Sequence, residues 1–386
     1  MNNYSFWGYP RPDGSFGVRN HVAIISASDN SNFVARRIES LIKRTVSICP
    51  SFGRGEVGED LAQHVRTLSG MGINPNVHSV IVTALEPVIA SKVANEIAKS
   101  GKRVEVVTLD DDGGSIGATD KGVKLARQMV IEASCVEREK VSLDNLILGV
   151  ECGGSDTTSG VISNPVTGLV SDKLVDAGGT VILSETVEWM GAEHFLAKRA
   201  VNEEVAEEIF NAVKWYEDYI KSIGIDLIGT NPSPDNRKGG LTTIEEKALG
   251  AIKKGGSRPV QGIYKYAVRP DKKGLVLMDA PPPGVENITG LAGAGCQLII
   301  FSTGKGNAIG NPLVPTIKVT GNPRTIARIP DNIDVDLSDV FSKGMSLKDS
   351  GDLLFGEMIS YANGKLTTAE VLGDFEIAVT RIGYTV

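Results

Sequence analysis

The feature that most constrains the fold of this chain is a regular alternation of two kinds of segment. Short runs rich in β-branched residues, which are typical of strands, are followed by longer segments with the apolar spacing of a helix. Three such pairs occur in the first part of the chain: 21–26 with 32–43, 77–85 with 88–99, and 103–109 with 121–133. Strands that alternate with helices pair in parallel and are covered by helices on both faces. The sequence therefore predicts an α/β fold with mostly parallel sheets.

The length of the chain, 386 residues, corresponds to about two domains. The charged stretch 137–140 is the best candidate for the boundary, since an apolar strand begins soon after it at 146–150 (LILGV). We expect an N-terminal α/β domain at 1–140 and a C-terminal α/β domain at 141–386, which carries most of the loops discussed below. Both are expected to be Rossmann-like units.

The balance of charge excludes some classes of partner. The chain has 40 Lys and Arg against 47 Asp and Glu, a net charge of −7, whereas nucleic acids and anionic membranes require a basic face. No apolar stretch approaches the roughly 18 residues of a membrane helix, and the first residues lack the pattern of a signal peptide. The four cysteines form no CxxC pair, which indicates a reducing compartment. We expect a cytoplasmic enzyme that binds neither nucleic acid nor membrane.

The loop that follows the strand 146–150 has the composition of an anion-binding loop. Residues 151–160 (ECGGSDTTSG) combine small Gly and Ser residues, whose backbone N–H groups can approach a carboxylate closely, with the carboxylates of Glu151 and Asp156. Open α/β sheets bind ligands at the carboxyl ends of their strands, which is where this loop is predicted to lie. The alternative is simply a tight glycine turn before a helix.

Two later loops have related features. Residues 301–310 (FSTGKGNAIG) have a glycine spacing that fits neither the dinucleotide fingerprint nor the phosphate loop, so Lys305 and its neighbours indicate a general anion-binding loop. In 238–247 (KGGLTTIEEK), Thr243 and Glu246 form the pattern of a capping box, so a helix should begin at Thr243. The preceding glycines would let a ligand reach the positive helix end, although capping alone also explains Thr and Glu here. We expect the three loops to converge around one small anion.

These same segments resemble the altronate/galactarate dehydratase family. The resemblance covers nearly the whole chain, and its motifs follow in family order: 8–14 with 17–20, 151–160 with 164–165, 183–186, 236 with 238–250, 278–279, 289–290, 302–306 and 315–318. It implies a lyase, more closely a hydro-lyase of carbohydrate metabolism, which removes water from a sugar acid to give a 2-keto-3-deoxy acid. The large subunit of sulfolactate sulfo-lyase, which eliminates sulfite, is also similar.

Elimination from a hydroxy acid needs a base for the α-proton, positive charge or N–H groups for the developing enediolate, and an acid for the leaving group. The residues expected to transfer protons are Glu151, Asp156, Glu185 and Lys247, with Glu245 as a further titrating group. Those expected to bind the substrate are Gly153, Gly154, Ser155, Thr186, Asn236, Thr242, Thr243, Thr303, Gly304 and Lys305. At any one position, a structural ion pair or a helix cap is the alternative explanation.

The resemblance also implies a divalent metal, Fe²⁺ or else Mg²⁺ or Mn²⁺, with Cys152 and Asp279 as the expected ligands. The proline run 281–283 would hold Asp279 in a defined direction. Several soft ligands of the family pattern are replaced here: Arg54 stands at the place of one cysteine, and residues 83–87 lack another. Two alternatives follow. Either the metal binds through oxygen ligands, or the chain performs different chemistry on a similar acid.

The resemblance finally bears on partners. Longer members of the family carry a small additional N-terminal domain, and the resemblance to split enzymes implies either a separate small subunit or a self-sufficient variant. A homo-oligomer is expected for a metabolic enzyme of this class. Three functions stay open: elimination of water from a sugar acid, elimination of sulfite from a sulfonated hydroxy acid, and a non-catalytic acid-binding subunit that has lost the metal site.

Overall fold

The computed structural model describes residues 4–386, and within this range it contains two parallel sheets and one small antiparallel sheet. The four-stranded sheet has the order β4-β3-β5-β6, formed by Thr45–Ile48, His21–Ser26, Val77–Ala84 and Val104–Thr108. The seven-stranded sheet has the order β10-β11-β9-β8-β12-β13-β14, formed by Val260–Tyr264, Gly274–Met278, Thr180–Leu183, Ile147–Gly153, Leu298–Thr303, Thr316–Thr320 and Val335–Asp336. The predicted α/β class with Rossmann-like units is confirmed.

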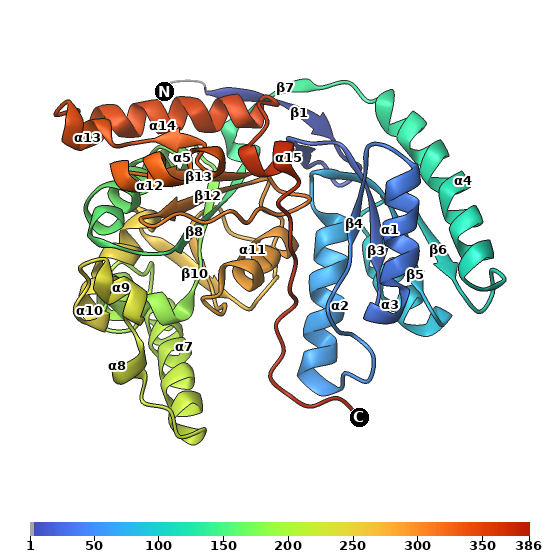
Figure 1. Cartoon of the computed structure of the whole chain (residues 1–386), viewed down its shortest axis with the longest axis horizontal. Helices are drawn as coiled ribbons and strands as arrows, with labels where there is room; N and C mark the ends of the chain where they lie inside the picture. Colours follow the sequence, from blue (N-terminus) through green and yellow to red (C-terminus); the bar gives the residue numbers. More distant parts are fainter. Residues whose placement is uncertain (1–3) are drawn as a thin grey trace.

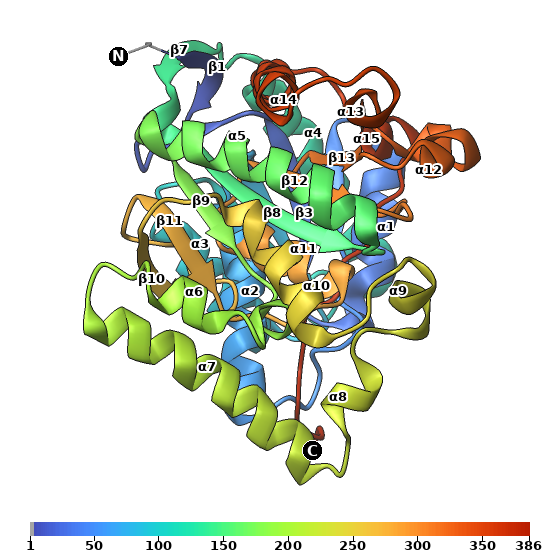
Figure 2. The same ribbon diagram turned by 90° about the vertical axis from the view of Figure 1, so that its left-hand side faces the viewer.

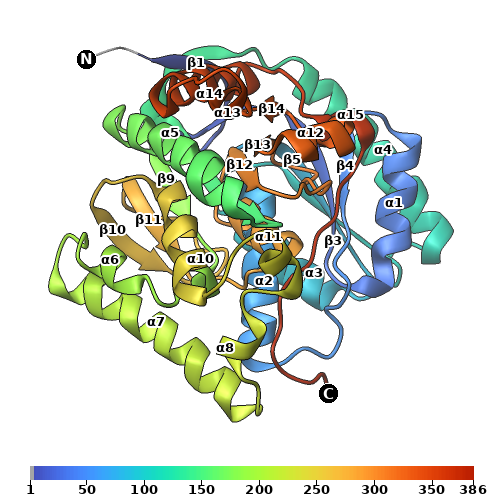
Figure 3. The same ribbon diagram turned by 60° about the vertical axis from the view of Figure 1, so that its left-hand side comes forward.

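Helices cover both faces of each parallel sheet (Figure 1). The four-stranded sheet carries α1 (Asn32–Leu41) and α4 (Gly114–Ser134) on one face, and α2 (Gly58–Ile73) and α3 (Pro87–Ala98) on the other. The seven-stranded sheet carries α11 (Gly284–Gly293) on the face toward α2. Its other face is covered by α5 (Asn164–Asp176), α7 (Glu203–Ser222) and α10 (Ile244–Ala251). α14 (Leu347–Ala362) packs on α5 (Figure 3). α2, α3 and α11 therefore form a helical layer between the two sheets.

The remaining elements are short. The antiparallel sheet has the order β2-β1-β7, formed by Phe16–Gly17, Ser5–Pro10 and Glu139–Ser142. The other helices are α6 (Glu193–Ala197), α8 (Leu227–Thr230), α9 (Pro234–Lys238), α12 (Pro323–Arg328), α13 (Asp339–Ser342) and α15 (Thr368–Leu372). In the described range, 4–386, none of the helices has the length and apolar character that a bilayer crossing requires.

The charged stretch that the sequence offered as a domain boundary runs into an edge strand. β7 pairs with β1 from Ser5 opposite Ser142 to Gly8 opposite Glu139. Its residues are mostly exposed, which is why the sequence has charged side chains there and no apolar alternation. Charged residues are common on edge strands, because they discourage pairing with other chains.

The two parallel sheets share one buried hydrophobic cluster, to which both Val82 of β5 and Ile299 of β12 belong. Between the sheets, α2 and α11 pack backbone against backbone. A Cβ added to Gly70 would lie 2.2 Å from the carbonyl oxygen of Gly293, so only glycine fits at this crossing. The close approach fixes the distance between the two units.

The C-terminal segment strengthens this junction. It runs between the two units (red in Figure 1) and ends beside α2. The side chain of Gln63 donates to the carbonyl of Thr380 at 2.8 Å, and the carboxylate of Asp60 accepts from the backbone N–H groups of Ile382 and Gly383 at 3.0 and 2.6 Å. The last residues of the chain are thus held by the first unit.

Asn76 is a further link between the units, and it is completely buried. Its amide nitrogen donates to the carbonyls of Gln297 and Leu313 at 2.9 and 3.0 Å, across the junction. Its oxygen accepts from the backbone N–H of Val18 at 2.9 Å. Every polar atom of the side chain is therefore used.

We expect Asn76→Ala to lower the free energy of unfolding by at least about 3 kcal/mol, because it leaves several buried backbone groups without partners at about 1–3 kcal/mol each. Urea unfolding followed by circular dichroism measures the loss. Asn211→Ala, which changes an exposed position on α7, is the matched control and should stay within about 0.5 kcal/mol of the parent. Equal effects of the two substitutions would contradict this account of the junction.

Candidate functional site

Two of the predicted anion loops meet at the carboxyl end of the seven-stranded sheet. The chain goes from β8 to β9 on one side and later returns to place β12 on the other side of β8. In open α/β sheets, such a change of direction leaves a ligand-binding crevice between the carboxyl ends of the two strands. The loops after β8 and β12 lie at this place, and the backbone N–H of Lys305 donates to the carbonyl of Gly154 at 2.8 Å.

The third predicted loop reaches the same place through its glycines. The backbone N–H and the hydroxyl of Thr157 both donate to the carbonyl of Gly239, at 3.0 and 3.1 Å. A Cβ added to Gly239 would lie 2.7 Å from the Cβ of Asp156. The Gly-Gly pair therefore allows close contact between two backbones, which is a structural reason for the glycines.

The helix end in this third loop faces elsewhere. α10 begins where the sequence predicts, and Thr243 accepts from the backbone N–H of Glu246. The carboxylate of Glu246 bonds Thr242, so the capping box is not reciprocal. Thr242, Thr243 and Glu245 are exposed, and Glu245 lines a separate cavity of about 550 Å³ beside α7. The three loops thus converge in part, without the N-terminus of α10.

A fully buried ion pair lies behind the loop after β8. The Nζ of Lys254 is 2.5 Å from Oε2 of Glu185, and the two side chains are 0% and 1% exposed. The same carboxylate accepts from the backbone N–H of Cys152 at 3.0 Å, and the thiol lies 3.7 Å from its other oxygen. Glu185 has φ = 71°, a left-handed conformation that costs about 1–3 kcal/mol and is typical of functional sites.

Glu151, the residue before Cys152 on β8, is also completely buried. One of its oxygens accepts from the amide of Asn287 on α11, which also donates to Ser184 at 2.8 Å. Within residues 4–386, the other oxygen of Glu151 has no hydrogen-bond partner, and neither does the amide oxygen of Asn287. Buried polar atoms without partners are rare, and here they leave acceptors that a ligand could use.

Two further contacts surround the loop after β9. Lys247 of α10 lies 2.7 Å from a carboxylate oxygen of Glu188 and donates to Asn231 at 3.0 Å. The hydroxyl of Thr186 donates to Asp279 at 2.5 Å. The predicted residues Thr186, Lys247 and Asp279 therefore all lie around this loop, although each already has a partner.

Asp156 orders the loop that contains it. One carboxylate oxygen accepts from the hydroxyl of Thr158 and the backbone N–H of Ser159 at 2.6 and 2.9 Å, and the other accepts from the amide of Asn322 at 2.8 Å. Gly304 packs directly against it, since an added Cβ would lie 2.1 Å from the carboxylate. These contacts indicate an anchoring carboxylate, and its predicted part in proton transfer stays a prediction.

The other predicted binding residues are also structural contacts at this end of the sheet. The amide of Asn236 donates to the carbonyl of Ser155 at 2.9 Å. Thr303 is buried and accepts from the backbone N–H of Gly306 at 2.8 Å. Gly153 lies against the ring of Phe301, where a Cβ would be 2.9 Å away.

Burial sets the protonation states of the buried cluster formed by Glu151, Cys152, Glu185 and Lys254. Burial raises the pKa of Glu185 to about 7 and raises the pKa of Glu151 well above its ordinary value, to which the neighbouring Glu185 adds. Burial alone would lower the pKa of Lys254, but the facing carboxylate of Glu185 raises it. The cluster thus combines an amine and two carboxyl groups whose pKa values are all raised, and one of these carboxyl groups titrates near neutral pH, which suits acid–base chemistry.

The predicted metal ligands do not form a complete set. The thiol of Cys152 faces Glu185, and Asp279 is bonded to Thr186. Burial raises the pKa of Cys152 well above its ordinary value, which disfavours the thiolate that a metal requires. Over residues 4–386, no three or more His, Cys, Asp or Glu side chains are grouped to hold a metal ion. The predicted Fe²⁺, Mg²⁺ or Mn²⁺ stays a prediction.

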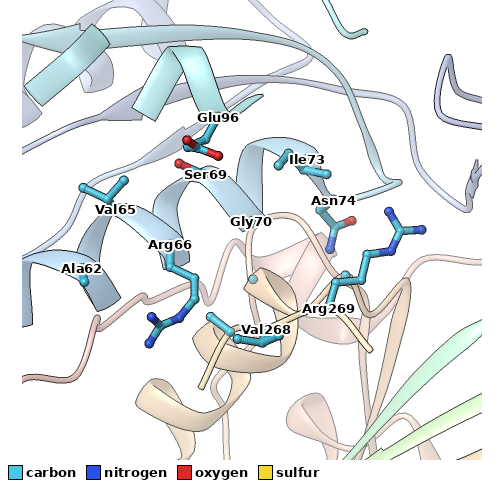
Figure 4. Close-up of a pocket in the computed structure, with 13 residues that line it drawn as sticks. Ala62, Val65, Arg66, Ser69, Gly70, Ile73, Asn74, Glu96, Val268 and Arg269 are labelled. Carbon is cyan, nitrogen blue, oxygen red and sulfur yellow. The ribbon is translucent and has the colours of Figure 1, made fainter. Parts of the chain in front are cut away.

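The groove shown in Figure 4 lies at the seam between the two units and is not part of this cluster. It has a volume of about 420 Å³, between α2, α3 and the loop 267–269. Of its charged residues, Arg66 donates to the carbonyl of Tyr266 at 2.9 Å and Arg269 pairs with Asp13 at 3.1 Å. None of the predicted site residues lines it.

The structure adds residues that sequence reasoning missed, namely Lys254, Asn287 and Glu188. Lys254 stands in a Lys-Lys-Gly-Gly stretch that has the composition of an exposed helix end, so no local signal indicates its burial. Asn287 lies near the start of α11, next to the acidic Glu286, and no local signal distinguishes it from a solvent-exposed residue. Glu188 follows Glu185 by three residues, and this spacing next to a matched motif is a signal that could have indicated it.

Comparison with known proteins gives matches along almost the whole chain. Residues 143–385 match the C-terminal domain of D-galactarate/altronate dehydratase, and residues 8–134 match the second domain of D-galactarate dehydratase/altronate hydrolase. The (2R)-sulfolactate sulfo-lyase subunit beta of Chromohalobacter salexigens is 40% identical over 99% of this chain and 98% of its own length. Altronate dehydratase of Bacillus subtilis is 32% identical over 99% and 79%. Galactarate dehydratase (L-threo-forming) of Escherichia coli is 29% identical over 95% and 74%.

The raised pKa of Glu185 predicts how stability depends on pH. Between the ordinary value of 4.5 and the folded value of about 7, the folded chain holds a proton that the unfolded chain has released. This group therefore stabilises the fold at low pH and loses that contribution as the pH rises through about 7. We expect the free energy of unfolding to fall between about pH 5 and 7.5, by up to about 1.4 kcal/mol per pH unit, and to fall less steeply in Glu185→Gln.

Urea unfolding at a series of pH values measures this slope. Glu207→Gln, which removes an exposed carboxylate on α7, is the matched control and should keep the slope of the parent. A slope that is the same in Glu185→Gln as in Glu207→Gln would show that Glu185 is ionised throughout the range.

Proposed function

The chain belongs to the D-galactarate/altronate dehydratase family, whose relatives named above are dehydratases and a sulfo-lyase subunit, and from this premise we propose that it is a lyase acting on a small 2-hydroxycarboxylate. The observation that carries the proposal is the buried cluster of Glu151, Glu185 and Lys254 at the carboxyl end of the seven-stranded sheet. It offers a proton acceptor and a proton donor at one pH, which β-elimination requires.

In the proposed reaction, the carbon–hydrogen bond next to the carboxylate breaks first. Glu185 is suited to take this proton, since its pKa of about 7 leaves part of it ionised near neutral pH. Lys254 keeps that carboxylate in place and holds a positive charge beside the developing enediolate. Glu151, whose pKa burial raises well above its ordinary value, is suited to protonate the leaving group. The enol that results becomes a 2-keto acid.

The first candidate leaving group is water, lost from a sugar acid to give a 2-keto-3-deoxy acid. Both family matches and the two dehydratases support it. The backbone N–H groups of the loop after β8 would bind the substrate carboxylate, because its small Gly and Ser residues let an anion approach them closely.

The second candidate leaving group is sulfite, lost from a sulfonated hydroxy acid. It is favoured by the 40% identity to a sulfo-lyase subunit that this chain matches almost from end to end, whereas it matches about three quarters of the two dehydratases. The name of that relative also supports a separate small subunit as the partner of this chain.

The test is an assay of the chain, with and without the small subunit of a related sulfo-lyase, on sulfolactate, altronate and galactarate with Fe²⁺, Mg²⁺ or Mn²⁺ supplied. Sulfite release and 2-keto acid formation are measured separately, so that the two leaving groups are distinguished. We expect turnover of one acid, and a loss of kcat of at least about 100-fold in Glu185→Gln, the usual contribution of a general base.

Glu207→Gln on the exposed side of α7 should keep the parent rate. Absence of turnover with every acid and every metal, in the presence of the small subunit, would reject the lyase and leave the acid-binding subunit. Full activity of Glu185→Gln would reject the assignment of the base while leaving the lyase.

A further inference from the structure

A cavity of about 680 Å³ opens beside the loops after β8 and β12, and its charged lining is mostly basic. Lys238, Lys305, Arg324 and Arg328 line it, together with the single acidic residue Asp156. The cations come from α9, α12 and the loop after β12, and Figure 2 shows α9 and α12 along the same edge of the molecule. Such a concentration of positive charge is notable in a chain whose acids outnumber its bases by 47 to 40.

The positive charge of this cavity is only weakly balanced. Both carboxylate oxygens of Asp156 accept hydrogen bonds from its own loop and from Asn322. The carboxylate of Asp235, which is 76% exposed, lies 3.8 Å from Lys238 and 3.9 Å from Lys305. Two basic groups thus share one exposed carboxylate at long distances, and exposed pairs of this kind contribute little.

The two arginines lie on α12 and add to this excess. The guanidinium of Arg328 donates to the backbone carbonyl of Lys305, a neutral acceptor. Arg324 is exposed at the start of the same helix. Like charges that line one cavity repel each other, so the arrangement favours a ligand that brings negative charge.

The cavity is connected to the buried cluster by one short loop. Cys152, at the start of this loop, contacts Glu185, and Asp156, at its end, lines the cavity. Between them, the hydroxyl of Ser155 lies 4.0 Å from the thiol of Cys152. Four residues span at most about 14 Å, so the cavity lies close to the loop that contacts the buried cluster.

We propose that this cavity binds a second anionic group of the substrate, a carboxylate or a sulfonate at the end remote from the carbon that loses its proton. The substrate is therefore a dianionic acid. The inference rests on the proposed lyase function and narrows its substrate class, because an acid with a single carboxylate and a neutral tail would leave the cations unpaired. Guanidinium groups bind such planar or tetrahedral oxyanions through several N–H groups at once.

The test is isothermal titration calorimetry at low salt with four acids that have no leaving group to lose. Sulfoacetate and tartronate carry two anionic groups, whereas glycolate and lactate carry one. We expect the parent to bind the dianions at least tenfold more tightly than the monoanions. This preference should disappear in Arg324→Gln and in Lys238→Gln, while the affinity for glycolate and lactate should be unchanged.

Arg127→Gln, which removes an exposed cation from α4, is the matched control for net charge and should keep the preference. Inorganic sulfate should bind at least tenfold more weakly than sulfoacetate, because it lacks the carboxylate. Equal affinity for dianions and monoanions in the parent, or the same loss in Arg127→Gln as in Arg324→Gln, would overturn the proposal. So would sulfate that binds as tightly as sulfoacetate.

Because the calorimetry needs no turnover, its result is separable from that of the lyase assay. Dianion binding that depends on Arg324 in a chain without lyase activity would keep this subsite and reject the enzyme. If the chain has lyase activity but its affinity for dianions does not change in Arg324→Gln and Lys238→Gln, the lyase function is retained and the proposed anion-binding cavity is rejected.

Discussion

The buried pair of Glu185 and Lys254 is the interaction on which the rest of the site depends. Two charges removed from water are stable only when geometry and further hydrogen bonds compensate for the lost hydration. Here the compensation comes from the backbone N–H of Cys152 and from the short contact to the amine. The left-handed backbone of Glu185 turns its carboxylate to where both donors can reach it. The pair therefore joins the loops after β8 and β9 to the turn that follows α10.

Much of the architecture could be predicted from periodicity alone. The strand 21–26 is found at the predicted residues, the strand predicted at 77–85 ends one residue earlier, and most of the predicted helices lie within a few residues of their expected bounds. α4 is the clearest difference, since it begins at Gly114, seven residues before the predicted start. Glycines in its first turn hide the helical pattern, because they carry no apolar side chain. β1 and β7 could not be predicted as partners, since they lie far apart in the chain and no local pattern links them.

The site was predictable in its loops and not in its buried charges. Small residues after a strand are a local signal, and so the contact between Gly154 and Lys305 could be expected from the sequence. The burial of Lys254 depends on how the end of α10 packs under β9, and a sequence of two lysines and two glycines carries no trace of it. The hypothesis of three loops around one anion changes accordingly. The loops after β8 and β12 contact each other, and the glycines 239–240 pack against the first of them. The acid–base groups Glu185 and Lys254 are buried behind these loops.

The return of the C-terminal segment to α2 has a consequence for how this protein can be divided. Gln63 and Asp60 of the first unit hold residues 380–383, which follow the whole second unit in the chain. Cleavage of the chain near residue 137, between the two units, would leave two fragments. These fragments would still contact each other through these hydrogen bonds and through the close approach of Gly70 to Gly293. The first unit is therefore not an independent module. If it were fused to another protein, it would lack the C-terminal residues 380–383 that Gln63 and Asp60 bind.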